Sequence, residues 1–305
     1  MSKHRNVAAS VRARLFALSK ERKEDFTLTL LRYANERLLY RIGQSPYRDR
    51  FVLKGAMLFA VWGDAVYRPT KDIDLLGLGM SDESSLETCF HDLCEIHTTD
   101  DGIVFLPKTI MVQAIRDTTE YGGMQVRINS RLEQAEIQLQ IDIGIGDVII
   151  PPAEYIDFPT LLKDSAQPRI RAYPKETVIA EKIHAMVTLG SANSRMKDFY
   201  DLYTLSREFP FKGSQLQKAI TATFERRGTE ISTTTASAMT SVFYIDQVKS
   251  TQWSAFLNRS HIEGVPEAFT EVGNALIPFV SPILKSSTEA IDFNANWDPG
   301  VGWKW

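Results

Sequence analysis

The sequence predicts an α+β protein, with a small mixed sheet and helices in its first half and a mostly helical second half. Strand-like and helix-like segments are interleaved up to about residue 150, whereas the segments beyond residue 175 are strongly helical. The clearest strand is 136–147, where apolar and polar side chains alternate. We therefore expect two domains, residues 1–165 and residues 166–305.

Composition supports a globular protein of about two domains, because 305 residues can bury a sizeable core. Hydrophobic residues make up 44% and charged residues 24%, which is ordinary for this class. The formal net charge of -3 argues against attraction of the whole surface to nucleic acid, although a local basic patch stays compatible with it.

The cysteines and the N-terminus indicate a cytoplasmic protein. Cys89 and Cys94 lie five residues apart in a predicted helix. This spacing suits neither a disulfide nor a zinc site and favours a reducing compartment. The N-terminus lacks the apolar segment of a secretory signal. No stretch approaches the roughly 18 uninterrupted apolar residues of a membrane-spanning helix, so we expect no membrane partner.

The first half begins with elements recognised from their apolar spacing and caps. They are, in chain order, a helix at 25–42, a strand at 51–54, a short buried helix after Gly55, a strand at 72–76 and a helix from 81. A strand at 103–115 follows, which Pro107 is expected to interrupt. The segments 124–132 and 136–147 predict a hairpin, because only a short polar turn separates them.

The second half is expected to be helical up to an irregular tail. Helices are predicted at 176–190, 194–209 and 214–228, the last with Gly228 as a stop signal. The tail 296–305, NWDPGVGWKW, contains too much Gly and Pro for a helix. Its rings, Trp297, Trp303 and Trp305, are expected to dock on the surface of a domain.

The stretch RPTKDIDLLG places Asp72 and Asp74 on alternate positions of a predicted strand, so both carboxylates share one face. Two close like charges repel unless a cation lies between them, and a metal ion is the simplest such cation. An isolated pair of this kind is more often two surface acids. Asp142, on the polar face of its own strand, is either a third carboxylate of the site or a cross-hairpin partner of Arg127 or Arg131.

The order of these elements, with KG at 54–55 and DID at 72–74, resembles the nucleotidyltransferase superfamily typified by DNA polymerase β. The strings RPTKDIDL, AEKIHAM and RMKDFYDLYTL further resemble the AbiEii/AbiGii toxins of abortive-infection toxin–antitoxin systems. The resemblance covers roughly residues 45–210 well and the C-terminal third weakly. It implies a polymerase β-like fold and metal-dependent transfer of a nucleotide from an NTP.

The resemblance also implies roles for individual residues. Asp72 and Asp74 would hold Mg²⁺ or Mn²⁺, and Asp142 is the candidate for completing a second metal site. The residues expected to bind the nucleotide are Lys54, Gly55, Ala56, Arg68, Thr70, Lys71, Lys182 and Asp201. Ala56 and Met57 depart from the family pattern, which often has a small hydroxyl or a glycine after this glycine, so the backbone would bind phosphate alone.

In the helical half, the resemblance assigns function to Lys182 and Asp198. The lysine would neutralise triphosphate charge, and Asp198 would orient it or accept a proton, with Asp201 able to replace Asp198. Without the resemblance, the two acids would be read as partners of Arg195 and Lys197 on an exposed helix face. His184 is interpreted as structural.

The resemblance implies RNA, specifically the 3′ end of tRNA, as the acceptor, and a cognate antitoxin as a protein partner. Two alternatives remain. The chain is either a nucleotide-binding scaffold that has lost turnover, or a small-molecule nucleotidyltransferase of the aminoglycoside type. The first has no chemical reason to keep Asp72, Asp74, Lys182 and Asp198 together, and the second is not expected to carry AEKIHAM and RMKDFYDL. Transfer of a phosphoryl group to protein is also compatible with these residues.

Overall fold

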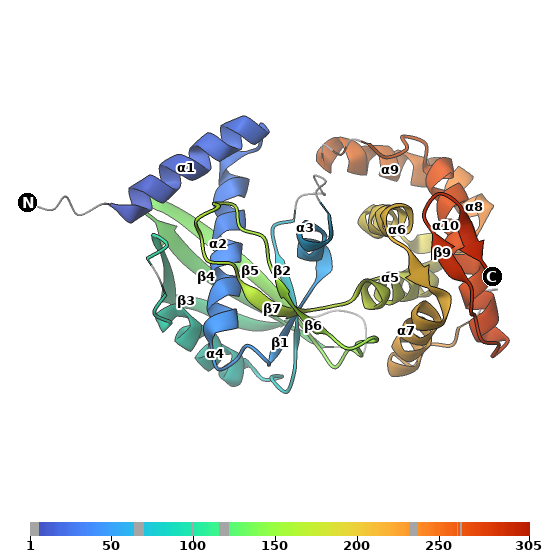
Figure 1. Cartoon of the computed structure of the whole chain (residues 1–305), viewed down its shortest axis with the longest axis horizontal. Helices are drawn as coiled ribbons and strands as arrows, with labels where there is room; N and C mark the ends of the chain where they lie inside the picture. The colour runs from blue at the N-terminus through green and yellow to red at the C-terminus, as the bar shows by residue number, and fades with distance from the viewer. Residues whose placement is uncertain are drawn as a thin grey trace, which may run out of the picture. The chain divides into compact units, whose positions relative to one another are not determined.

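The computed structural model describes residues 6–63, 70–98, 100–115, 122–231, 237–260, 262 and 264–305. The chain forms two compact units, coloured from blue to red along the sequence in Figure 1. The first unit comprises residues 1–146 and 154–173, and the second comprises residues 147–153 and 174–305.

The first unit is built on a seven-stranded mixed sheet with the order β3-β4-β5-β2-β1-β7-β6. The pairs β2–β5 and β1–β7 are parallel, and the other neighbours are antiparallel. The α+β class is thereby confirmed. The strands are β1 (Phe51–Lys54), β2 (Ile73–Gly77), β3 (Ile103–Ile115), β4 (Gly123–Leu132), β5 (Ala135–Ile145), β6 (Glu154–Asp157) and β7 (Arg169–Ala172).

Helices pack on the sheet of this unit, and Figure 1 shows α2 lying across it. They are α1 (Val7–Arg22), α2 (Phe26–Gln44) and α4 (Glu83–Glu95), with a 3₁₀ turn (Gly55–Leu58) leading into the four-residue α3 (Phe59–Trp62). The alternation expected along β5 is confirmed, because its apolar side chains at 137, 139, 141 and 143 are buried. The polar side chains between them are partly or fully exposed.

Two strands were missed in the Pro-containing stretch after residue 150. Both β6 and β7 are only four residues long, and β7 lies between β1 and β6 through tertiary pairing. This pairing extends the first unit to Tyr173, beyond the composition change near residue 165. Strand β3 is continuous through Pro107, because it is an edge strand whose register shifts between Leu106 and Met111.

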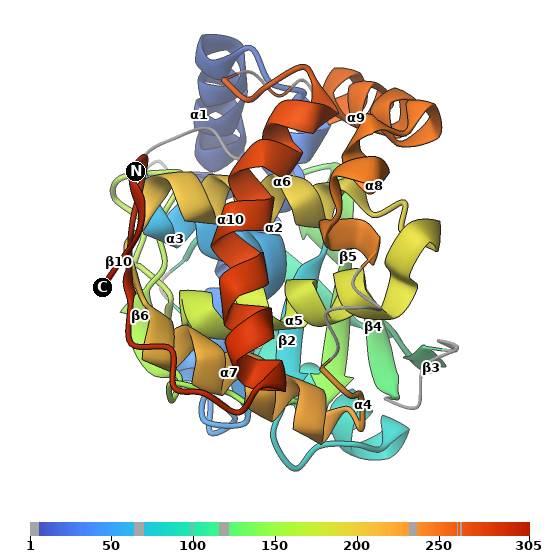
Figure 2. The same cartoon turned by 90° about the vertical axis from the view of Figure 1, so that its right-hand side faces the viewer.

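The second unit is mainly helical, as expected. Its helices are α5 (Lys175–Leu189), α6 (Met196–Glu208), α7 (Gly213–Arg226), α8 (Ser241–Ile245), α9 (Gln247–Ser260) and α10 (Phe269–Thr288). Figure 2 shows α10 running across α6 and α7, with which it packs. This helix contains Pro278 and Pro282. Local propensity did not predict it, because proline in a helix interior is unfavourable.

The C-terminal tail folds as a hairpin and not as the irregular segment expected from its Gly and Pro content. Strands β9 (Asn296–Asp298) and β10 (Gly302–Lys304) pair with each other, and β9 also pairs with β8 (Phe211–Lys212). Trp297 is buried and donates from Nε1 to the Ser206 carbonyl at 2.7 Å. Trp303 stacks on Phe279 at a centroid distance of 5.8 Å. The expected docking is confirmed for these two rings, while Trp305 is 88% exposed.

Within the part of the chain that the structure describes, no helix has both the length and the apolar character needed to cross a lipid bilayer.

We expect Trp297→Ala to destabilise the second unit by about 3–5 kcal/mol, because it removes a buried ring and leaves the Ser206 carbonyl unpaired. Urea unfolding followed by circular dichroism measures this loss. Trp305→Ala is the matched control, since that exposed ring contributes little. Equal stability of the two variants would contradict the structural role of the docked tail.

Candidate functional site

Lys54, Asp74 and Asp142 form one row across three neighbouring strands. Lys54 is the register partner of Asp74 on β1 and β2, and Asp74 is the partner of Asp142 on β2 and β5. Register partners point to the same face of a sheet. The row therefore places two carboxylates side by side, with an ammonium group on the far side of Asp74.

Gly55 brings the chain unusually close to Asp74. Its φ of +71° lies in the left-handed region that favours glycine. A Cβ added at this position would lie 2.6 Å from Cγ and 2.7 Å from Cβ of Asp74, and closer still to Oδ2. The glycine is thus required to make room for the Asp74 side chain, in addition to any approach of its backbone to a phosphate.

The turn after Gly55 differs from the expected helix. A 3₁₀ turn and a four-residue helix replace it, so the free N–H groups belong to a short element with a small dipole. The side chain of Ala56 is buried, which leaves only its backbone available to a ligand. The Lys54 ammonium lies 5.5 Å from the centre of the Tyr173 ring. This cation–π contact restricts the orientation of the lysine side chain.

Asp72 lies one residue before β2, in a segment anchored to α2. The buried Asn35 donates from Nδ2 to the Lys71 carbonyl at 3.0 Å. Thr70 makes a weak contact of 3.4 Å from its hydroxyl to the Asp72 carbonyl. Arg68, which was expected to bind phosphate, lies outside the described residues. Asn35 was missed in the sequence, because it is one of several polar residues of α2 and no local pattern distinguishes it from the others.

Asp142 is bound by amides and not by arginines. Gln125 and Gln140 donate hydrogen bonds to its carboxylate at 3.0–3.2 Å. The alternative of a cross-hairpin ion pair is wrong, because Arg127 is the register partner of Gln140 and Arg131 that of Glu136. The alternation of β5 already placed Gln140 on the same face as Asp142. Gln125 could not be found in this way, because its position depends on the register between two strands.

The donors of this row suit a hard divalent cation. Among the described residues, no three His, Cys, Asp or Glu side chains are arranged to hold a metal ion together. Mg²⁺ is usually held by one or two carboxylates together with water and substrate phosphates, and not by a cage made of protein alone. The carboxylate oxygens of Asp72, Asp74 and Asp142 therefore have the right chemistry for Mg²⁺ or Mn²⁺ bound with a triphosphate.

In the second unit, Lys182 on α5 contacts two aspartates on α6. Its Nζ lies 3.0 Å from Asp198 Oδ1 and 2.6 Å from Asp201 Oδ2. Arg195 Nε lies 2.9 Å from the other oxygen of Asp198. Two cations thus balance two anions. This balance is needed because unpaired buried charges are costly.

The alternative of a solvated helix face for these acids is wrong. The side chain of Asp198 is 4% exposed and that of Asp201 is fully buried. Asp198 keeps Arg195 as a partner, as that alternative expected, but its other partner is the Lys182 ammonium. Phe199 and Tyr200, on the same helix, are buried in the core.

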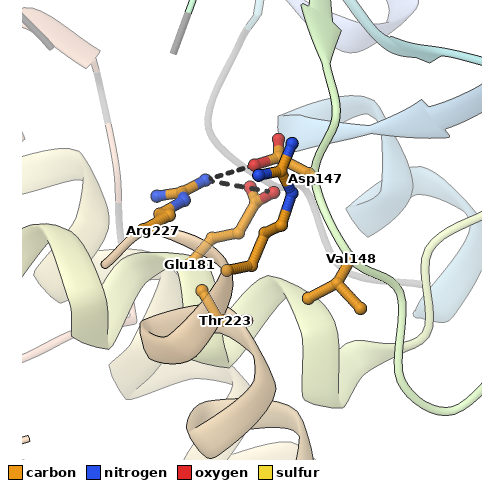
Figure 3. Close-up of a pocket in the computed structure, with 6 residues that line it drawn as sticks. Asp147, Val148, Glu181, Thr223 and Arg227 are labelled. Atoms are coloured by element: carbon orange, nitrogen blue, oxygen red, sulfur yellow. Dashed lines mark hydrogen bonds and ion pairs between the residues drawn. The ribbon is translucent and has the colours of Figure 1, made fainter. Parts of the chain in front are cut away.

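A second cluster in this unit surrounds Arg227. Figure 3 shows the carboxylates of Asp147 and Glu181 directed at its guanidinium, at 2.9 and 3.5 Å from Nη2. The space between the side chains leaves no room for a water-sized molecule, so this is a packed ion-pair cluster. His184 lies at its edge, with Nδ1 at 3.3 Å from Arg227 Nη1 and Nε2 at 2.9 Å from Thr229 Oγ1.

The neighbours of His184 define its protonation state. A guanidinium can only donate, so Nδ1 accepts from Arg227 and Nε2–H donates to Thr229. Burial, reinforced by the Arg227 charge, lowers the pKa of His184 to about 4. The interpretation of His184 as a structural residue agrees with a buried neutral imidazole.

A hollow of about 760 Å³ lies elsewhere in the first unit, at the end of β1 away from Lys54. It is lined by residues 43–46, Arg48, Asp49, Tyr155 and Arg169. None of the residues expected to act in catalysis or nucleotide binding lines this hollow.

Comparison with known proteins identifies one family. A family model described as "Nucleotidyl transferase AbiEii toxin, Type IV TA system" matches residues 37–275. The match includes both the row around Asp74 and the Lys182 cluster. No curated protein matches the sequence.

Two solved structures from Helicobacter pylori resemble the chain at low similarity. The crystal structure of JHP933 is 15% identical, with 85% of this chain and 94% of that chain covered and a TM-score of 0.40. A second solved structure from H. pylori is 13% identical, with 85% of this chain and 97% of that chain covered and the same TM-score of 0.40. Similarity at this level adds nothing to the interpretation of the site.

Gly55→Ala is expected to cost about 2–4 kcal/mol of stability, because the new Cβ meets the base of the Asp74 side chain in addition to straining φ. Gly79→Ala is the matched control in the same unit. Its φ is +70°, but its Cβ would meet only the tip of Arg50, which can move. Urea unfolding of both variants separates the effect of the collision with Asp74 from that of the positive φ. Equal losses of stability in the two variants would rule out a cost of the collision.

Acid is expected to destabilise the second unit through His184. Its folded pKa is lowered, so the unfolded chain binds the proton more tightly. The stability present above pH 6.5 is therefore lost as the pH falls toward 4, by about 2 kcal/mol between pH 7 and pH 4.5. Urea unfolding at both pH values measures the loss. His184→Gln should reduce the pH dependence by this amount, and an unchanged dependence would contradict the assignment.

Proposed function

Because the chain belongs to the AbiEii family of nucleotidyltransferase toxins of type IV toxin–antitoxin systems, we propose that it transfers a nucleotide from an NTP to the 3′ end of tRNA. The chain is a nucleotidyltransferase, and the choice of RNA as acceptor is the step proposed here. A toxin that extends tRNA would stop translation, which accords with a growth-arresting role.

The observation that carries the proposal is the row of Lys54, Asp74 and Asp142 beside Gly55. Nucleotidyl transfer requires little covalent chemistry from the protein, and its rate depends on positioning and charge neutralisation. Two adjacent carboxylates supply the oxygen ligands, and a neighbouring glycine allows the backbone to come close to the phosphates.

We assign Asp72 and Asp74 as the ligands of Mg²⁺ or Mn²⁺, and Asp142 as the carboxylate that completes a second metal site. When bound, such a cation neutralises triphosphate charge and aligns the oxygens of the reacting phosphate. Lys54 supplies positive charge beside Asp74, and the Gly55 and Ala56 backbone approaches a phosphate. Arg68, Thr70 and Lys71 complete the proposed nucleotide site.

For Lys182 we propose a role in neutralising triphosphate charge, with Asp198 and Asp201 orienting its ammonium. The hydrogen bonds from Lys182 to both carboxylates support orientation. Burial of the two acids argues against either of them accepting a proton from the incoming nucleophile, since a general base must reach the proton it abstracts.

The type IV toxin–antitoxin description implies an antitoxin partner. We propose that this partner is a cognate protein that relieves the toxicity of the transferase. Co-expression of the antitoxin should therefore restore growth of cells that produce the chain.

Purified protein incubated with total tRNA, a divalent cation and each α-labelled NTP in turn should label tRNA. Asp72→Asn and Asp74→Asn should each reduce labelling by roughly a thousandfold or more, since several kcal/mol of charge stabilisation are lost. Asp157→Asn is the matched control, because it removes an exposed carboxylate from β6 of the same unit.

Retained labelling in Asp72→Asn would refute the assigned site. Absence of label on every RNA, with NTP still bound, would refute RNA as the acceptor. Aminoglycosides supplied in parallel then test the small-molecule alternative, and label on the protein itself tests transfer to protein.

A further inference from the structure

The carboxylate of Asp142 lies at the end of a chain of amide hydrogen bonds that crosses the sheet. Gln113 Nε2 on β3 donates to Gln125 Oε1 on β4 at 3.0 Å. Gln125 Nε2 donates to Asp142 Oδ1 on β5 at 3.0 Å. These residues are register partners, so they extend the row of Lys54, Asp74 and Asp142 to the edge of the sheet.

A second amide reaches Asp142 from its own strand. Gln140 Nε2 lies 3.2 Å from both Oδ1 and Oδ2 of Asp142. The two residues are separated by one position on β5, so their side chains share a face. Gln140 and Gln125 together give the carboxylate three amide contacts, two on Oδ1 and one on Oδ2.

The charge of Asp142 orients both amides. An ionised carboxylate can only accept hydrogen bonds, so Gln125 and Gln140 must present their NH₂ groups to it. The carbonyl oxygen of Gln125 is then directed away and accepts from Gln113. Reversal of either amide would place a carbonyl dipole against a negative charge, so the arrangement has one favourable direction.

The amides also offset a repulsion within the row. Asp74 and Asp142 are register partners on parallel strands, and like charges placed opposite each other are destabilising. Lys54 offsets this at Asp74, and the NH₂ groups of Gln125 and Gln140 offset it at Asp142. Hydrogen bonds to charged groups are stronger than those between neutral groups, which suits this purpose.

We propose that Gln125 and Gln140 are positioning residues that hold the Asp142 carboxylate beside Asp74 and leave one lone pair of Oδ2 for a cation. A carboxylate offers about four lone-pair sites, and three amide contacts occupy two on Oδ1 and one on Oδ2. Asp142 then serves as a ligand through Oδ2 alone. The inference rests on the proposed function, because it assumes the cation assigned there.

The experiment measures metal binding separately from turnover. Mn²⁺ is the probe, and loss of its free electron paramagnetic resonance signal reports binding in the presence of a non-hydrolysable NTP. Gln140→Leu removes both contacts of that amide and should weaken Mn²⁺ binding by about tenfold to a hundredfold, as expected for residues that orient a ligating carboxylate. Gln125→Leu should weaken Mn²⁺ binding less, because Gln140 still contacts both carboxylate oxygens of Asp142 in this variant.

Gln138→Leu is the matched control. Gln138 lies on the same strand and the same face, but it is exposed and opposite Asn129. The Gln138→Leu variant should bind Mn²⁺ with the same affinity as the unmodified protein. A double variant separates positioning from general damage, because Gln140→Leu should have no further effect once Asp142→Asn has removed the ligand. Urea unfolding of each variant verifies that the first unit stays folded at the assay temperature.

Unchanged Mn²⁺ binding in Gln140→Leu or in Asp142→Asn would overturn the inference. Additive losses in the double variant would also overturn it. These results leave the proposed function intact if Asp72→Asn abolishes both Mn²⁺ binding and transfer to tRNA. Conversely, Mn²⁺ binding that survives in Asp72→Asn would refute the proposed metal site itself.

Discussion

The register of β2 against its two neighbours is the constraint on which the first unit depends. A slip of one residue would turn Asp74 toward the apolar face and break the row from Lys54 to Asp142. The apolar alternation of β5 opposes such a slip, because it would expose buried side chains. The same burial that stabilises the sheet therefore keeps the carboxylates together, and Gly55 provides the space that one of them requires.

The buried charges of the second unit are stabilised by ion pairs, unlike the Asp142 carboxylate of the first unit. Asp198 and Asp201 are buried beside the partly buried Lys182, and buried charges are tolerated only if they are paired and hydrogen-bonded. On the sheet, by contrast, the amides of Gln125 and Gln140 supply partial positive charge to Asp142. Ion pairing therefore fixes the lysine cluster, and a hydrogen-bond network orients the third carboxylate. Both arrangements limit side-chain motion before any ligand binds, which lowers the ordering cost of binding.

The amino-acid sequence alone indicated most elements of the first 210 residues. It also indicated the candidate residues of the row around Asp74 and of the Lys182 cluster. Local patterns sufficed for the alternation of β5 and the spacing of Asp72 and Asp74, since both need only neighbouring residues. Lys182 and Asp198 were indicated by the resemblance to a known family and not by a local pattern. The motifs around Lys182 and Asp198 also placed these residues on two successive helices. Helix α10 was not predicted, because Pro278 and Pro282 lower the local helix propensity. In the folded chain, packing of α10 against other helices outweighs that preference.

The tertiary structure alone decided which side chains meet. Residues 125 and 142 are brought together by strand register, and Gly55 and Asp74 by the pairing of β1 with β2. Burial of Asp201 and docking of Trp297 likewise depend on contacts between distant segments. Composition and periodicity report what a segment prefers by itself. Contacts between segments depend on how the whole chain buries its apolar surface, and that result becomes visible only in the folded structure.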